Sequence, residues 1–278
     1  AGKTFTTLLF ALRLRMRGVL VFIVAPEKGF EYRTACEAIG GQYLRIAPGS
    51  ADCINLMEIR RTTLDIDSNM TDNVQRSDSV LLDKVQDIHT YLRLRYPEMT
   101  PEESYQLNIA LLECYESFGI TKDNASLLKP DGSFKEMPDF AHLYPFLLKV
   151  PVLKNVALSV KELIDFGMGG QTNVDLTSSF IVFDTSGNKQ RDISSSTFIA
   201  PSFIRDEASR SRTRKKAVIG DELWLIAGNE GNEQAADFVI ELAKTIRGYG
   251  GIFVSATQNT IDYFALRDDK FGDTIALF

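Results

Sequence analysis

Two groups of residues in this 278-residue chain have the types and spacing needed for chemistry on a phosphate. The first is Ala1-Gly2-Lys3-Thr4, which matches the second half of the phosphate-binding pattern G-x-x-x-x-G-K-S/T and precedes a helical sequence. In that pattern the lysine neutralises phosphate oxygens and the threonine hydroxyl binds Mg²⁺. Four residues at a helix start also match by chance, so the interpretation depends on the rest of the chain.

The second group is an acidic pair, Asp221 and Glu222, which follows the apolar run 217–219 and Gly220. A carboxylate at the end of a buried strand can hold hydrated Mg²⁺, and the next one can orient or deprotonate an attacking water. The alternative is a surface acidic pair after a core strand. The order of helix, buried strand and acidic strand favours the chemical interpretation.

A second aspartate has the same local pattern, because Asp184 ends the apolar run 180–183. The residues after it, Thr185-Ser186-Gly187, supply no base for water. We therefore expect the metal at Asp221 and keep Asp184 as the alternative. The ordinary interpretation of Asp184 is a turn-forming aspartate.

Two more polar residues are placed by the last strand candidate, the run 252–256. Gln258 follows it, and ligands of an open parallel sheet bind at the carboxyl ends of the strands. Gln258 is therefore predicted to sense the γ-phosphate or the attacking water, and its alternative is to cap the next helix. Arg247 ends the helical pattern before this strand. It either complements the helix C-terminus or reaches a neighbouring subunit's nucleotide as an arginine finger.

The elements that position these residues indicate an α/β fold. The run 19–24 is apolar throughout, which is typical of a strand buried on both faces of a parallel sheet. Between residues 66 and 168 strand-like runs disappear and helical spacing takes over, with a capping-box sequence at Thr100-Pro101-Glu102-Glu103. We therefore predict an all-helical insertion at 66–168, between core segments 1–65 and 169–278.

Composition and charge limit the other classes of protein to which this chain could belong. The longest apolar stretch has 7 residues, far fewer than the roughly 20 of a membrane-spanning helix. Three cysteines without a C-x-x-C spacing indicate a reducing cytoplasm, and two widely separated histidines do not suggest a metal site. The net charge of -6 argues against a surface coated in phosphate-neutralising residues, but it leaves DNA open as a partner.

Three longer stretches resemble one family. They are "APEKGFEYRTACEAIGGQYLRIAPGSADCINLMEI", "GQTNVDLTSSFIVFDTSG" and "IRGYGGIFVSATQNTIDYF". Together with "AGKT" they are similar to the TraC/TraE-type conjugation ATPases of bacterial type IV secretion systems. These are VirB-class large ATPases in the FtsK/HerA-like superfamily of hexameric motors. Two residues depart from the family pattern, namely Ala25, where an aspartate is usual, and Gly220, which interrupts the apolar run.

The resemblance implies a RecA-like P-loop NTPase core that hydrolyses ATP with Mg²⁺. It also implies a homo-hexamer that works with other type IV secretion components, cytoplasmic and peripheral at the inner face of the bacterial cytoplasmic membrane. The residue roles it implies are Ala1, Gly2, Lys3 and Thr4 at the nucleotide, Thr4 and Asp221 at Mg²⁺, Glu222 as base, Gln258 as phosphate sensor and Arg247 as finger.

Two other functions stay open at this level. One is a DNA-translocating ATPase like the coupling proteins, which a steep salt dependence of DNA binding would favour. The other is a nucleotide-gated scaffold with little hydrolysis, against which the presence of Glu222 argues. Because the pattern begins at its rear half, we also expect its leading half and an N-terminal domain upstream, and weak or absent activity for residues 1–278 alone.

Overall fold

The computed structural model describes residues 2–60, 79–187, 190–209, 211, 213–223, 225 and 233–257. The chain forms two compact units. The first, here called the sheet unit, comprises Ala1–Pro48 and Val174–Phe278, and the second, the helical unit, comprises Gly49–Asn173. None of the described helices is long and apolar enough to cross a membrane.

The described part of the sheet unit contains a five-stranded sheet in the order β2-β3-β1-β4-β5. The strands are β1 (Leu20–Ala25), β2 (Gln42–Arg45), β3 (Phe180–Asp184), β4 (Lys216–Asp221) and β5 (Gly251–Ala256). Every neighbouring pair is parallel, which confirms the parallel sheet predicted from the sequence. The three inner strands, β1, β3 and β4, are buried along their whole length, as strands covered on both faces must be.

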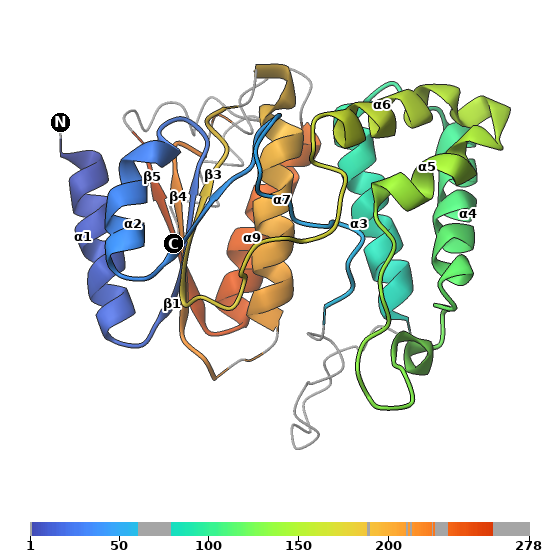
Figure 1. Cartoon of the computed structure of the whole chain (residues 1–278). Coiled ribbons are helices and arrows are strands. Elements are labelled where there is room, and N and C mark those ends of the chain that lie inside the picture. The colour runs from blue at the N-terminus through green and yellow to red at the C-terminus, as the bar shows by residue number, and fades with distance from the viewer. Residues whose placement is uncertain are drawn as a thin grey trace. The chain divides into compact units, whose positions relative to one another are not determined.

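Helices cover both faces of this sheet. They are α1 (Lys3–Met16), α2 (Arg33–Ala38), α7 (Gln190–Ser209) and α9 (Glu233–Gly248), and the short 3-10 helix η1 (Gly29–Tyr32) follows β1. Figure 1 shows α1 and α2 on one side of the sheet and α7 and α9 on the other. On the α1 side, Ala11 is buried against a core formed by β1, β3 and β4, with Leu8 and Leu12 packed beside it.

A buried lysine fixes the amino end of β4. Lys216 is 2% exposed, and its ammonium donates to the carbonyls of Ala208 at 2.9 Å and Tyr249 at 2.8 Å, and also to that of Ser211. Burial, and then the charge of Arg214, lower the pKa of this amine. Ala208 lies in the last turn of α7 and Tyr249 directly follows α9. One side chain therefore ties the strand to the ends of both helices.

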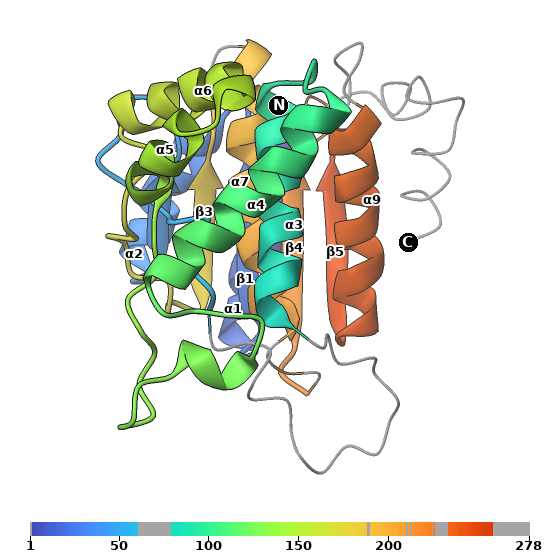
Figure 2. The same cartoon turned by 90° about the vertical axis from the view of Figure 1, so that its right-hand side faces the viewer.

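The described residues 79–168 of the helical unit contain helices and no strand. The helices are α3 (Val80–Arg95), α4 (Pro101–Ser117), η3 (Asn124–Leu127), α5 (Phe140–Leu148), η4 (Pro151–Leu153) and α6 (Lys154–Asp165). The capping box predicted at the start of α4 is confirmed, because Thr100 and Glu103 bond each other's backbone amides. α4 packs against α3 and α5, and α5 packs against α6 (Figure 2).

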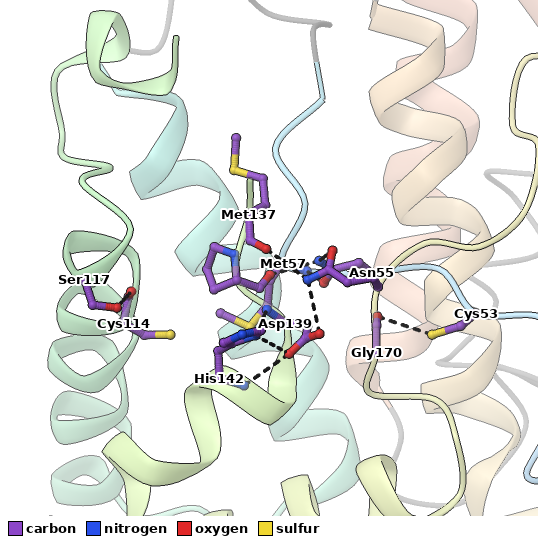
Figure 3. Close-up of polar contacts among 11 residues, drawn as sticks. Cys53, Asn55, Met57, Cys114, Ser117, Met137, Asp139, His142 and Gly170 are labelled. Carbon is purple, nitrogen blue, oxygen red and sulfur yellow. Dashed lines mark hydrogen bonds and ion pairs between the residues drawn. The ribbon is translucent and has the colours of Figure 1, made fainter. Parts of the chain in front are cut away.

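The two ends of the helical unit are bonded to each other. The amide of Cys53 donates to Oδ1 of Asn173 at 2.8 Å, and the amide of Asn55 donates to Oγ1 of Thr172 at 3.0 Å. The side chain of Asn55, which is buried, also donates to the carbonyl of Pro138 at 2.9 Å (Figure 3). The bonds of Cys53 and Asn55 to residues 172 and 173 join the segment that enters the helical unit to the segment that leaves it, so they hold the two ends of the unit together.

Candidate functional site

The start of α1 leaves a row of backbone amides without helical partners. Gly2 is the N-cap residue, with φ 117°, a backbone conformation that favours glycine, and no side chain caps this end. The amide of Thr6 makes the first helical bond, to the carbonyl of Gly2 at 2.9 Å. The amides of Gly2, Lys3, Thr4 and Phe5 therefore have no acceptor within the helix, and the positive end of the helix dipole lies there.

The same four residues line a pocket of about 760 Å³. Its other described lining residues come from the ends of strands, Lys28 and Glu31 after β1 and Thr257 after β5. In an open parallel sheet this is the edge at which ligands bind. The volume is within the usual range of small-molecule and cofactor sites, roughly 300–1,000 Å³.

Beside this pocket, Lys3 contacts both members of the acidic pair. Its Nζ lies 2.8 Å from Oδ1 of Asp221 and also contacts Oε1 of Glu222, and both acids are 3% exposed. Partial burial lowers the pKa of Lys3, but hydrogen bonds and charge from the two carboxylates outweigh it and raise the pKa above its ordinary value. The structure thus brings together three residues that the sequence analysis singled out from opposite ends of the chain.

The two oxygens of Asp221 have different partners. Its Oδ2 accepts a hydrogen bond from the hydroxyl of Tyr32 at 2.9 Å. Its Oδ1 is buried and receives no hydrogen bond of good geometry from a described residue, although the ammonium of Lys3 is close enough to form an ion pair. A buried carboxylate oxygen of this kind is suited to a cation.

Glu222 has a strained backbone. It is the single non-glycine residue with positive φ, 57°, among the described residues. Its amide donates to the carbonyl of Ala256 at 2.8 Å, which ties the end of β4 to the end of β5. Left-handed conformations of residues other than glycine destabilise a fold by about 1–3 kcal/mol and concentrate at functional sites. From this backbone conformation the Glu222 side chain contacts Lys3.

Gly220 makes room for the turn that carries Glu222. A Cβ added at Gly220 would lie 1.9 Å from Cδ1 of Leu223, a side chain that is 1% exposed. The glycine that departs from the family pattern therefore has a local steric reason. It lets Leu223 fold back over the end of β4.

Gly220→Ala should lower the free energy of unfolding by about 1–3 kcal/mol, the usual effect of overpacking a core. The matched control is Gly248→Ala, because a Cβ at Gly248 meets no atom within 4 Å and its φ is not positive. We expect this control to be neutral or to stabilise by up to about 1 kcal/mol, the difference in helix propensity. Urea unfolding of both variants measures the effect, and equal stabilities would mean that Leu223 moves freely.

Sequence reasoning missed Tyr32. This residue is completely buried at the end of η1, and burial, together with the charge of Asp221, raises its pKa well above the ordinary value. Its hydroxyl therefore remains a donor. The one signal in the sequence is its position shortly after the carboxyl end of β1, which does not distinguish it from an ordinary core aromatic residue.

The alternative aspartate, Asp184, is occupied by its neighbours. Its Oδ1 accepts from the amide of Ser186 at 2.9 Å and from the Ser186 hydroxyl at 2.5 Å, and its Oδ2 accepts from the hydroxyl of Tyr43. Gly29 packs so tightly on this carboxylate that a Cβ there would lie 2.2 Å from Oδ1. These contacts fit the turn-forming interpretation of Asp184.

Arg247 is not brought to this group of residues. It is exposed in the last turn of α9, directly before the amino end of β5, whereas Asp221 pairs with Ala256 at the carboxyl ends of β4 and β5. Six residues of strand, roughly 16–20 Å at about 3.3 Å per residue, separate the two edges. Ala1 and Gln258, also predicted site residues, lie outside the described residues.

The sequence matches no family model and no curated protein. Sixteen chains of known structure are similar to it. One is VirB4 of Thermoanaerobacter pseudethanolicus, with a TM-score of 0.79 and 26% sequence identity over 99% of this chain and 71% of that chain. The match confirms both the α/β fold class and the VirB-class resemblance that the sequence indicates.

Proposed function

We propose that this chain is the ATP-hydrolysing core of a type IV secretion motor, which powers apparatus assembly or substrate transfer in conjugation. The observation that carries the proposal is the convergence of Lys3, Asp221 and Glu222 beside a pocket at the start of α1. A cation, a metal-binding carboxylate and a base are the groups that phosphoryl transfer to water requires. The similarity to VirB4 supports the assignment to type IV secretion.

The residues present fit a nucleotide with Mg²⁺. The amides at the start of α1 that have no acceptor within the helix, and the ammonium of Lys3, would hold the phosphates. Asp221, through the Oδ1 that Lys3 contacts in the structure, and the hydroxyl of Thr4 would hold the ion. Bound Mg²⁺ neutralises charge that develops on the phosphate oxygens. No described cluster of three or more His, Cys, Asp or Glu residues could hold a metal alone, so the phosphates would supply further ligands.

Lys3 has two competing sets of partners in this mechanism. In the structure its ammonium contacts the acidic pair, and a bound phosphate would attract it into the pocket. Glu222 would then be released to orient the attacking water and accept its proton. The strained backbone of Glu222 supports hydrolysis over a nucleotide-gated scaffold, because a protein that only binds has no use for a base held in this way.

The remaining roles extend to the assembled motor. We propose a homo-hexamer at the cytoplasmic face of the membrane with other secretion components, and Gln258 as its sensor of phosphate state. Arg247 would then act on the nucleotide of a neighbouring subunit, because it lies at the opposite edge of the sheet from its own acidic pair.

The proposal is tested on the full-length protein by nucleotide binding and hydrolysis. Lys3→Ala should weaken ADP binding about 10- to 100-fold, the effect of losing a charge-assisted hydrogen bond of about 1.5–3 kcal/mol. Removal of Mg²⁺ with EDTA should abolish turnover. Arg13→Ala, which removes an exposed cation from the same helix, should change neither. A wild-type protein that neither binds nor hydrolyses ATP contradicts the proposal.

A further inference from the structure

We propose that Tyr32 is a positioning residue for Asp221, with its hydroxyl holding the carboxylate so that Oδ1 stays turned to Lys3 and the cation. The inference rests on the proposed function, since it has meaning only if Asp221 binds Mg²⁺. It concerns a residue that no motif indicates, on the short helix η1 after β1.

The geometry gives Tyr32 little freedom. Its ring belongs to the core cluster that includes Ala25, Cys36 and Val182, and none of its surface is exposed. Its hydroxyl donates to Oδ2 of Asp221 at 2.9 Å. A carboxylate with one oxygen bonded to a fixed donor can present its other oxygen in one direction only, and that oxygen is the one beside Lys3. Phenylalanine would fill the same apolar space, so packing alone does not explain the hydroxyl.

Tyr32 also lies between β4, which ends at Asp221, and α1, which begins at Lys3. Besides donating to Asp221, its hydroxyl lies near Thr7, in the second turn of α1, which acts to lower the pKa of Tyr32 against the larger effects of burial and Asp221. The same helix carries Lys3 and Thr4 in its first turn. Tyr32 therefore lies between α1, which carries Lys3 and Thr4, and the end of β4, which carries Asp221.

A second tyrosine–aspartate pair in the same sheet shows what is particular to the first. Tyr43 donates to Oδ2 of Asp184, much as Tyr32 donates to Oδ2 of Asp221. The other oxygen of Asp184 is taken by Ser186, whereas Oδ1 of Asp221 has no well-aligned donor among the described residues. Of these two pairs, only the Tyr32 pair has a carboxylate oxygen that contacts a pocket-lining cation, Lys3, and so faces the proposed phosphate and metal site. Tyr43→Phe is therefore a matched control for Tyr32→Phe.

The experiment measures how Mg²⁺ changes the affinity of full-length protein for a fluorescent ADP analogue. For Tyr32→Phe we expect about a tenfold rise in the Mg²⁺ concentration at half-saturation, the effect of one lost hydrogen bond to a charged group. Analogue affinity without Mg²⁺ should stay as in wild type. At a low Mg²⁺ concentration, turnover of Tyr32→Phe should be lower than that of wild type. It should recover as the Mg²⁺ concentration is raised. Thr7→Val should give a smaller shift in the same direction, and it provides a second variant if Tyr32→Phe folds poorly.

Each outcome decides between explanations. A wild-type protein that binds the analogue no better with Mg²⁺ overturns the proposed function itself. If Mg²⁺ acts on wild type but Tyr32→Phe has the wild-type half-saturation, Tyr32 does not position Asp221. An equal loss of affinity with and without Mg²⁺, or an equal effect of Tyr43→Phe, would show that the hydroxyl serves stability alone and would also overturn the inference.

Discussion

Glu222→Gln is expected to lower ATP turnover of the full-length protein by about 10² or more, the usual effect of removing a positioned base. Glutamine keeps the length and shape of the side chain but accepts no proton. It is also unbranched at Cβ, so the strain at φ 57° should be nearly the same in both proteins. The loss should therefore appear in the chemical step and not in the fold, and single-turnover hydrolysis measures it directly.

The same variant should retain nucleotide binding. Lys3 contacts Glu222 in the structure and would have to leave it to meet a phosphate, so removing one carboxylate charge should leave ADP affinity equal to wild type or slightly higher. Glu31→Gln is the control, because Glu31 also lines the pocket but does not contact Lys3 in the structure. Turnover within a factor of about two of wild type would exclude Glu222 as the base and return attention to the surroundings of Asp184.

The meeting of Lys3 with the acidic pair could be predicted because two strong local signals constrain it. The Gly-Lys-Thr sequence fixes Lys3 at a helix start, and the apolar run before Asp221 fixes that residue at a strand end. In a parallel sheet all strands end at the same edge, so the two groups are brought close without any knowledge of loops. The pairing of β1 with β4, which the sequence does not give, completes the placement, because α1 packs on these two strands.

Other parts of the site depend on contacts that leave no local pattern. Asp184 and Asp221 both end buried strands, and they differ through Ser186 and the separate tyrosines that bond them. The strain at Glu222 likewise depends on a bond to β5. Such tertiary contacts determine which aspartate presents an oxygen to Lys3, and composition and periodicity do not reveal them.

The helical unit shows a similar limit. Helical spacing predicts the insertion at 66–168, whereas the compact unit runs from Gly49 to Asn173. The described parts of the additional segments, 49–60 and 169–173, contain no helix or strand, so periodicity cannot assign them to either unit. Hydrogen bonds of Asn55 and Asn173 to distant residues are what hold them in the helical unit.

The two roles of Arg247 that the sequence left open differ in where they need this residue to lie. Because it precedes β5 while the acidic pair follows β4, its own nucleotide site is a strand length away. Strand β5 carries the chain from the edge of the sheet near Arg247 to the opposite edge, where Asp221 pairs with Ala256. Arg247 either interacts with the carbonyl end of α9, or it serves a site in the next subunit.

The two roles of Arg247 predict effects of very different size when the residue is removed. A helix-terminal charge contributes about 0.3–1 kcal/mol to stability and nothing to catalysis. An arginine finger contributes about 10³ to 10⁵ in rate. We expect Arg247→Ala to lower turnover of the assembled ring by about 10³ or more. Lys244→Ala, which removes another exposed cation from α9, should have no comparable effect.

Mixing two inactive variants tests action between subunits. Arg247→Ala subunits keep Glu222, and Glu222→Gln subunits keep Arg247, so some interfaces in a mixed ring would pair an intact base with an intact arginine. Turnover of rings shown to be mixed should then rise well above that of either variant alone. If Arg247 acts within its own subunit or only on stability, no interface in the mixture regains both groups. Mixed rings without recovery would therefore refute action in trans.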